Sequence, residues 1–147
     1  MMKLSKILCA VDLSDHSKQV AQYAAMLAKA TDAHLFVMYT APSLTQYVGF
    51  HVPPNTIDNF VGEIVSGAEK AMESFVAEHF AGLSVTSKVY VGYAAEEIIS
   101  RADEEQVDMI IMGTHGRKGI DRILFGSVAE KVVKNALQPV LTVRPAR

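Results

Sequence analysis

The sequence predicts an α/β fold: a doubly wound parallel sheet of five strands with helices on both faces. Short apolar runs alternate with longer segments of helical period along the whole chain, which is typical of such a sheet. The run at residues 109–112 is apolar at every position, as expected of a central strand buried on both faces. Neither a break in composition nor an internal repeat divides the 147 residues, so we expect a single domain over residues 1–147.

The first half of the chain holds two expected strands and two expected helices. The apolar run at residues 7–11 predicts the first strand, and a turn at residues 12–14 leads into a helix with apolar residues three and four positions apart. Residues 35–40 are aliphatic and aromatic and predict the second strand. Residues 41–55 contain three prolines and a glycine, which favour a loop. The longest helical pattern follows at residues 57–76.

The second half continues the alternation. Residues 84–91 alternate as a strand, which Gly92 ends, and residues 94–106 show the pattern of a shorter helix. The strand at 109–112 follows. Residues 127–137 predict the last helix, and Val140–Val143 predicts the last strand. The elements are therefore expected in the order β-α-β-α-β-α-β-α-β.

Composition and charge argue against several classes of protein. A net charge of -2 and a pI near 6.2 do not favour general nucleic-acid binding, which needs clustered positive charge. No apolar run approaches the roughly 20 residues that span a bilayer, so no membrane insertion is expected. The single cysteine, Cys9, lies in the first apolar run, which favours a buried thiol in a cytoplasmic protein. The histidines show no paired ligand spacing, so no metal site is expected.

The connection between the fourth strand and the last helix carries the clearest chemical signal. The fourteen residues from Gly113 to Gly126 exceed the about 2–6 usual in α/β connections, and four of them are glycines. Glycine lets backbone N–H groups approach a ligand closely, and a helix that begins at Ser127 offers unpaired N–H donors. A loop of this kind is suited to wrap a phosphate chain. It is neither a Walker A loop nor a Gly-x-Gly-x-x-Gly turn.

The loop also carries a family resemblance. Its pattern is Gly113-x-x-Gly116, then nine residues, then Gly126-Ser127. With this pattern the chain resembles the universal stress protein family, whose ATP-binding members carry G-x-x-G-x(9)-G-[S/T]. The resemblance covers nearly the whole chain. Further matching segments are residues 7–12, 91–92, 94–99, 107–113 and 138–143.

The resemblance implies the sheet order 3-2-1-4-5 and a site for ATP, or for ADP or AMP, with Mg²⁺ as the usual companion of a triphosphate. In that order the first and fourth strands are neighbours whose connections run opposite ways, and ligands bind at such a switch point. Asp12 would contact the nucleoside, Thr40 would offer backbone groups to the adenine edge, and Gly113 would lie against the ribose. The other implied contacts are Val11 and Met112 beside the base, and Gly116, Gly126, Ser127 and Val128 at the phosphates.

Some residues allow two interpretations. Asp12 either contacts the ligand or caps the first turn of the helix that follows it. His115 and Arg117 are expected on the phosphate side of the site, and the charge of a histidine changes near neutral pH. No second group is placed by the sequence to orient His115, so no catalytic residue is assigned. Residues 41–55 either pack on the long helix or close over the nucleotide as a lid. The basic residues of the glycine-rich loop either compensate phosphate charge or form a solvated face: Arg117, Lys118 and Arg122.

Three functions remain open at this point. The leading hypothesis is a nucleotide-binding regulatory module of the stress response, whose nucleotide state is read by a protein partner that the sequence does not identify. A homodimer through the edge strand Val140–Val143 is expected, because exposed edges invite pairing and members of the family commonly dimerise there. The first alternative is a slow ATPase or a nucleotidyl or phosphoryl transferase. The second is a dimeric interaction protein that binds no nucleotide.

Overall fold

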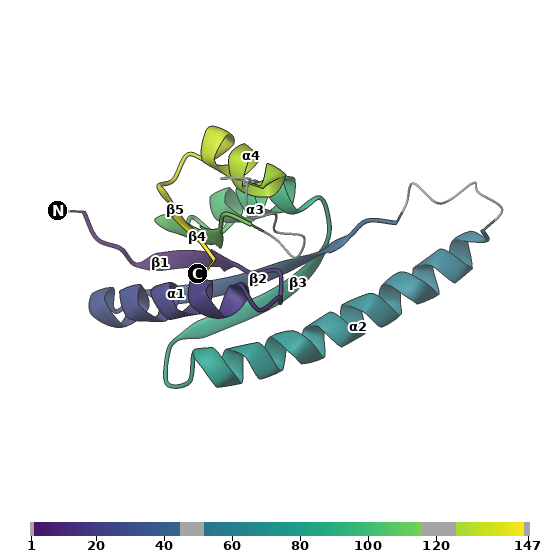
Figure 1. Ribbon diagram of the computed structural model, residues 1–147, viewed down its shortest axis with the longest axis horizontal. Helices are drawn as coiled ribbons and strands as arrows, with labels where there is room; N and C mark the ends of the chain where they lie inside the picture. The colour runs from purple at the N-terminus through teal and green to yellow at the C-terminus, as the bar shows by residue number, and fades with distance from the viewer. Residues whose placement is uncertain (1, 45–51, 116–125, 146–147) are drawn as a thin grey trace.

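Five strands form one sheet in the order β3-β2-β1-β4-β5, and every neighbouring pair is parallel (Figure 1). The computed structural model describes residues 2–44, 52–115 and 126–145. Both the alternating order of the elements and the order of the strands are as predicted. The strands are β1 (Lys6–Ala10), β2 (His34–Pro42), β3 (Val85–Gly92), β4 (Met109–Gly113) and β5 (Val140–Val143). The helices are α1 (Ser17–Thr31), α2 (Pro54–His79), α3 (Ala94–Glu104) and α4 (Ser127–Asn135).

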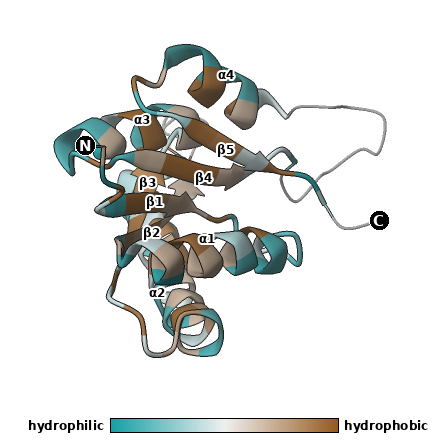
Figure 2. Ribbon diagram, turned by 90° about the vertical axis from the view of Figure 1, so that its left-hand side faces the viewer, coloured by the Kyte–Doolittle hydropathy of each residue, from teal (hydrophilic) through white to brown (hydrophobic). Residues whose placement is uncertain are grey.

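The helices cover the sheet in two layers. α1 and α2 lie on one face and α3 and α4 on the other (Figure 1). Successive side chains of a strand point to opposite faces, so Cys9 and Ile111 join the core under α1 and α2, while Leu8 and Ile110 join the core under α3 and α4. These four residues are fully buried, and β1 and β4 are coloured mostly as hydrophobic in Figure 2. The central position of both strands explains their uninterrupted apolar runs.

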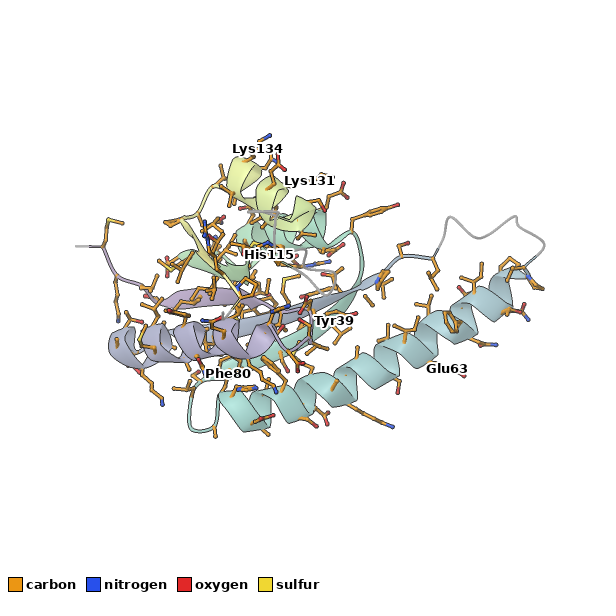
Figure 3. All side chains as sticks on the ribbon, viewed as in Figure 1. Tyr39, Glu63, Phe80, His115, Lys131 and Lys134 are labelled. Atoms are coloured by element: carbon orange, nitrogen blue, oxygen red, sulfur yellow. The ribbon has the colours of Figure 1, made fainter. Side chains whose placement is uncertain are left out.

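The helix α2 is longer than the layer in which it packs. Near its C-terminal end, Met72, Phe75 and the following Phe80 are buried in the core, and Phe80 is labelled beside this end in Figure 3. Its N-terminal turns extend past the sheet in Figure 1, and Phe60 there is 54% exposed, although Ile57 in the first turn is buried. The apolar period over residues 57–76 therefore predicted the helix correctly, but a period does not show which of its turns find a partner.

Element ends differ from the predicted ones by a few residues. β2 continues to Pro42, which pairs with Gly92 of β3, and α2 begins at Pro54, where proline fits the first helical turn. The ends of the predicted loop at 41–55 thus belong to β2 and α2. α3 and α4 each end two residues earlier than predicted. For α3 the reason is Gln106, whose φ of 52° is not helical.

Smaller shifts affect the strands. β1 and β3 are displaced by one residue from the predicted ranges, and Val11 follows β1 rather than ending it. The predicted bounds of β5 are confirmed, as is its place at an edge of the sheet. No helix in the described part of the chain is long and apolar enough to cross a membrane.

Candidate functional site

A cavity of about 500 Å³ opens at the carboxyl ends of β1 and β4, within the size range of small-molecule sites. The two strands are hydrogen-bonded neighbours, but β1 continues into α1 on one face of the sheet and β4 leads to α4 on the other. The cavity therefore lies at the switch point of the sheet, where ligands of doubly wound proteins bind.

Most of the predicted site residues line this cavity. The predicted residues that lie in its wall are Val11, Asp12, Met112, Gly113, His115, Gly126, Ser127 and Val128. Thr40 is not among the lining residues; it lies on β2, and its Oγ1 is buried without a hydrogen-bond partner in the described chain. Gly116, Arg117, Lys118 and Arg122 lie outside the described residues, as does most of the possible lid between residues 41 and 55.

Eight further lining residues were not predicted. They are Ala10, His16, Ser17, Val20, Ala94, Ile98, Thr114 and Ala129. Ala94 and Ile98 come from the first turns of α3, which begins at the same edge of the sheet as α1 and α4. Because α3 is far from the glycine-rich loop in sequence, only the strand order could have placed it here. His16 and Ser17 follow Asp12 closely, and their polar character next to a predicted contact was a usable signal.

Asp12 is held by its own turn. Its Oδ1 accepts hydrogen bonds from the Ser14 backbone N–H (3.0 Å), the Ser14 hydroxyl (2.5 Å) and the Ser17 hydroxyl (2.8 Å). Leu13, inside the turn, takes a φ of 62°. Oδ2 is buried and has no hydrogen-bond partner among the described residues. The N-cap position of α1 is His16, so the interpretation of Asp12 as the helix cap is wrong, although its Oδ1 does brace the approach to the helix.

The two ends of the glycine-rich loop are joined at its base. The Gly126 N–H donates to the Thr114 carbonyl at 2.7 Å, and the Thr114 N–H donates to the carbonyl of Val143 at 2.9 Å. A Cβ on Gly126 would come within 3.2 Å of the same Thr114 oxygen, which is closer than ordinary van der Waals contact. Gly113 is similarly close to the His115 carbonyl, at 3.3 Å. Both glycines are thus explained by close backbone approach.

The helices α1 and α4 both begin at the cavity but present different groups to it. In α1 the first two N–H groups are already used, because Ser17 donates to the Ser14 carbonyl and Lys18 to the Asp15 carbonyl. In α4 the first helical hydrogen bond is donated by Glu130, to the Gly126 carbonyl. The preceding N–H groups, at residues 127–129, have no partner among the described residues, and they stand at the positive end of the helix dipole. The α4 end of the cavity is therefore suited to an anion.

The described lining holds three titratable side chains. They are Asp12, His16 and His115. The His115 Nδ1 lies 2.7 Å from the hydroxyl of Thr114, which is buried. The described residues contain no cluster of three side chains that could hold a metal ion. The apolar part of the wall comes mainly from the ends of β1 and β4 and from the first turns of α3.

Fold and cavity together define a doubly wound α/β protein with a ligand crevice at its switch point. A family model, described as the universal stress protein family, matches residues 3–144. The chain belongs to this family.

Relatives in sequence agree with this assignment. Universal stress protein MJ0531 of Methanocaldococcus jannaschii is 35% identical over 144 residues, which cover 95% of this chain and 81% of the relative. Universal stress protein YxiE of Bacillus subtilis is 34% identical over 149 residues, covering 95% of this chain and 99% of the relative.

Solved structures share the fold. That of protein MJ0577, also from Methanocaldococcus jannaschii, superposes with a TM-score of 0.87 at 26% identity and covers 99% of both chains. A universal stress protein from Archaeoglobus fulgidus, solved in complex with dAMP, superposes with a TM-score of 0.59 at 25% identity and covers 96% of this chain and 98% of its own.

Proposed function

We propose that the chain binds ATP, or a related adenine nucleotide, in the switch-point cavity and acts as a regulatory module of the stress response. The observation that carries the proposal is that the two ends of the cavity offer different hydrogen-bonding groups. A buried carboxylate oxygen of Asp12 lies on the α1 side and backbone N–H groups lie at the start of α4, and neither has a hydrogen-bond partner among the residues that the structure describes. A nucleotide offers hydroxyl donors on its sugar and anionic oxygens on its phosphates, which match these two ends.

Each predicted site residue has a place in this proposal. Asp12 accepts from the sugar, and Gly113 lets the backbone approach it closely. The phosphates lie at the N-terminus of α4 and are bound by Gly126, Ser127 and Val128, with Gly116, His115 and Arg117 on the same side. Val11 and Met112, which are largely buried, and the backbone of Thr40 are assigned to the base. Mg²⁺ would accompany the phosphates of ATP.

The comparisons support the ligand class. The dAMP bound by the Archaeoglobus fulgidus protein is an adenine nucleotide, and that protein shares the fold along nearly the whole chain. In our proposal nucleotide occupancy changes the surface that a protein partner meets, and the protein acts in the cytoplasm, with which the buried free thiol of Cys9 is consistent.

Calorimetric titration with MgATP tests the proposal, and Ser127 allows a matched pair of variants. Ser127→Pro removes a backbone donor but leaves the helix intact, because proline fits the first helical position and the preceding Gly126 has an extended conformation (φ -73°, ψ 163°). Ser127→Ala keeps the N–H and removes only the hydroxyl. A hydrogen bond to a charged group contributes about 1.5–3 kcal/mol, so Ser127→Pro should weaken ATP binding about 10- to 100-fold. Ser127→Ala should weaken it less.

The same titrations define the outcomes against the proposal. Adenosine, which lacks phosphates, should bind the wild type and Ser127→Pro equally. Unchanged ATP affinity in Ser127→Pro would show that the N-terminus of α4 does not bind the phosphates. A folded, nucleotide-free wild type that binds no adenine nucleotide would refute the function and favour the nucleotide-independent interaction protein. Phosphate release measured in these samples separates the regulatory module from the slow ATPase or transferase.

The proposal includes a homodimer through β5. The strand is at the sheet edge and its residues Val140, Leu141 and Thr142 are only partly buried. The nearby exposed apolar side chains of α4 and of the turn before β5 are Val133 (46%) and Leu137 (85%). Sedimentation velocity should show a dimer that Leu137→Lys weakens. Tyr93→Lys, a change at another exposed apolar residue, is the matched control and should leave it intact. A monomeric wild type at high concentration would refute this part.

A further inference from the structure

The two oxygens of the Asp12 carboxylate differ in their hydrogen bonds. Three donors converge on Oδ1, whereas Oδ2 is buried with no partner in the described chain. We propose that Ser17 is a positioning residue. Together with Ser14 it holds Oδ1 in hydrogen bonds within the turn, so that Oδ2 is left to accept a hydrogen bond from a sugar hydroxyl of the ligand. This inference rests on the proposed nucleotide function and adds a selectivity to it: ribonucleotides are preferred to deoxy analogues.

Ser17 is well placed for this role. It is 2% exposed and is the first residue of α1, and its N–H donates to the Ser14 carbonyl, which fixes the start of the helix against the turn. Its hydroxyl makes a reciprocal pair with Asp12, accepting from the Asp12 N–H at 3.1 Å and donating to Oδ1 at 2.8 Å. The carboxylate is therefore tied to a rigid helix as well as to its own loop.

The number of donors decides which oxygen can serve a ligand. A carboxylate oxygen has about two lone-pair sites, and Oδ1 already meets three donors. A buried polar atom without a partner is costly, so the complement of Oδ2 must be a hydrogen-bond donor. Phosphate oxygens only accept and are suited to the α4 end. An adenine nucleotide has donors on its sugar hydroxyls and on the amino group of its base. In the proposed function the base lies against Val11, Met112 and Thr40, which leaves the 2′- or the 3′-hydroxyl as the donor to Oδ2.

The same turn makes Asp12→Asn an unusually direct probe. An asparagine amide can usually turn over and exchange its oxygen and nitrogen. Here the Ser14 backbone N–H, which can only donate, requires the oxygen at the Oδ1 position, so the NH₂ group must occupy the Oδ2 position. A donor then faces the ligand where an acceptor stood, with almost no change in shape.

The experiment is a competition titration of ATP, 2′-deoxy-ATP and 3′-deoxy-ATP against four proteins. The wild type should prefer ATP to one of the two analogues by about tenfold or more, and that analogue identifies the hydroxyl bound by Oδ2. Asp12→Asn should reduce the preference, because its NH₂ group can still donate to the hydroxyl oxygen, but the hydrogen bond then has no charged acceptor. Ser17→Ala should reduce the preference several-fold, and Ser17→Thr, which keeps the hydroxyl, should restore it.

The ratio of the affinity for ATP to the affinity for the deoxy analogue separates positioning from a general structural effect, because partial unfolding weakens the binding of all three ligands alike. Equal binding of ATP and both analogues by the wild type would overturn this inference and leave the nucleotide function standing. An unchanged ratio in a folded Ser17→Ala would overturn the role of Ser17. Should Ser17→Ala not fold, Ser14→Ala, which removes one of the three donors, must lower the ratio instead. A wild type that binds none of the three ligands would refute the proposed function itself.

Discussion

Cys9 lies in the middle of β1, fully buried between the two helical layers, and its thiol is suited to a quantitative test of the core. Burial raises its pKa to about 12, because the apolar surroundings disfavour the thiolate. In the unfolded chain the pKa is about 8.5. A pKa that is raised by folding contributes stability in full below the unfolded value, and this stability is lost as the pH rises toward the folded value. Between pH 8 and pH 10 the loss should be about 2 kcal/mol.

Urea unfolding at pH 8 and pH 10 under reducing conditions, with Cys9→Ala as the reference, measures this loss. Every other group titrates equally in both proteins, so the free-energy difference between them isolates the thiol. From pH 8 to pH 10 the free energy of unfolding of the wild type should fall by about 2 kcal/mol relative to that of Cys9→Ala. At pH 8 only about one folded molecule in ten thousand should carry the thiolate, so a thiol reagent should label Cys9 only on unfolding. Parallel pH profiles for the two proteins, or rapid labelling of the folded protein, would refute the reasoning.

Two further predictions concern the backbone of α2 and the base of the glycine-rich loop. A Cβ on Gly62 or Gly67 of α2 would meet nothing within 4 Å. Alanine at either position should therefore raise the free energy of unfolding by about 0.5–1 kcal/mol in urea titration. Gly82 is equally open but has a φ of 80°, so Gly82→Ala should lower the free energy of unfolding. Thr114→Val removes the buried hydroxyl that is hydrogen-bonded to the His115 imidazole. This change should lower the free energy of unfolding by about 1 kcal/mol in the same assay and weaken ATP binding in calorimetry. Unchanged values for both would show that the hydroxyl does not hold the loop base.

Local sequence patterns predicted the elements, and tertiary pairing decided their ends. Alternating apolar periods were sufficient to place five strands and four helices in order, because each strand or helix must bury its own apolar face. They did not show that β2 reaches Pro42, since that extension depends on its pairing with β3 up to Gly92. Nor did they show that Phe60 would be exposed, which depends on where the sheet ends beneath α2.

The candidate site divides in the same way. The loop glycines could be predicted because close backbone approach requires that residue type, and Gly113 and Gly126 do lie at a tight loop base. Asp12 was predicted at the site with two interpretations, of which the helix cap is excluded because the N-cap is His16, and its hydrogen bond from Ser17 depends on side-chain geometry that no pattern encodes. Ile98 reaches the cavity only because the strand order brings α3 over the ends of β1 and β4.

The contrast between α1 and α4 explains how one edge of a sheet can orient a ligand. Both helices start at the cavity, and an isolated helix start offers free N–H donors in either case. At α1 the turn carbonyls of Ser14 and Asp15 accept from the first two of these donors, and in the same turn one oxygen of the Asp12 carboxylate has no partner among the described residues. At α4 the preceding residue is Gly126, which has no side chain to cap the helix, and the N–H groups of residues 127–129 have no partner within the described part of the chain. The residues before each helix therefore place an acceptor at one end of the cavity and donors at the other, and a nucleotide bound as proposed would satisfy both in only one direction.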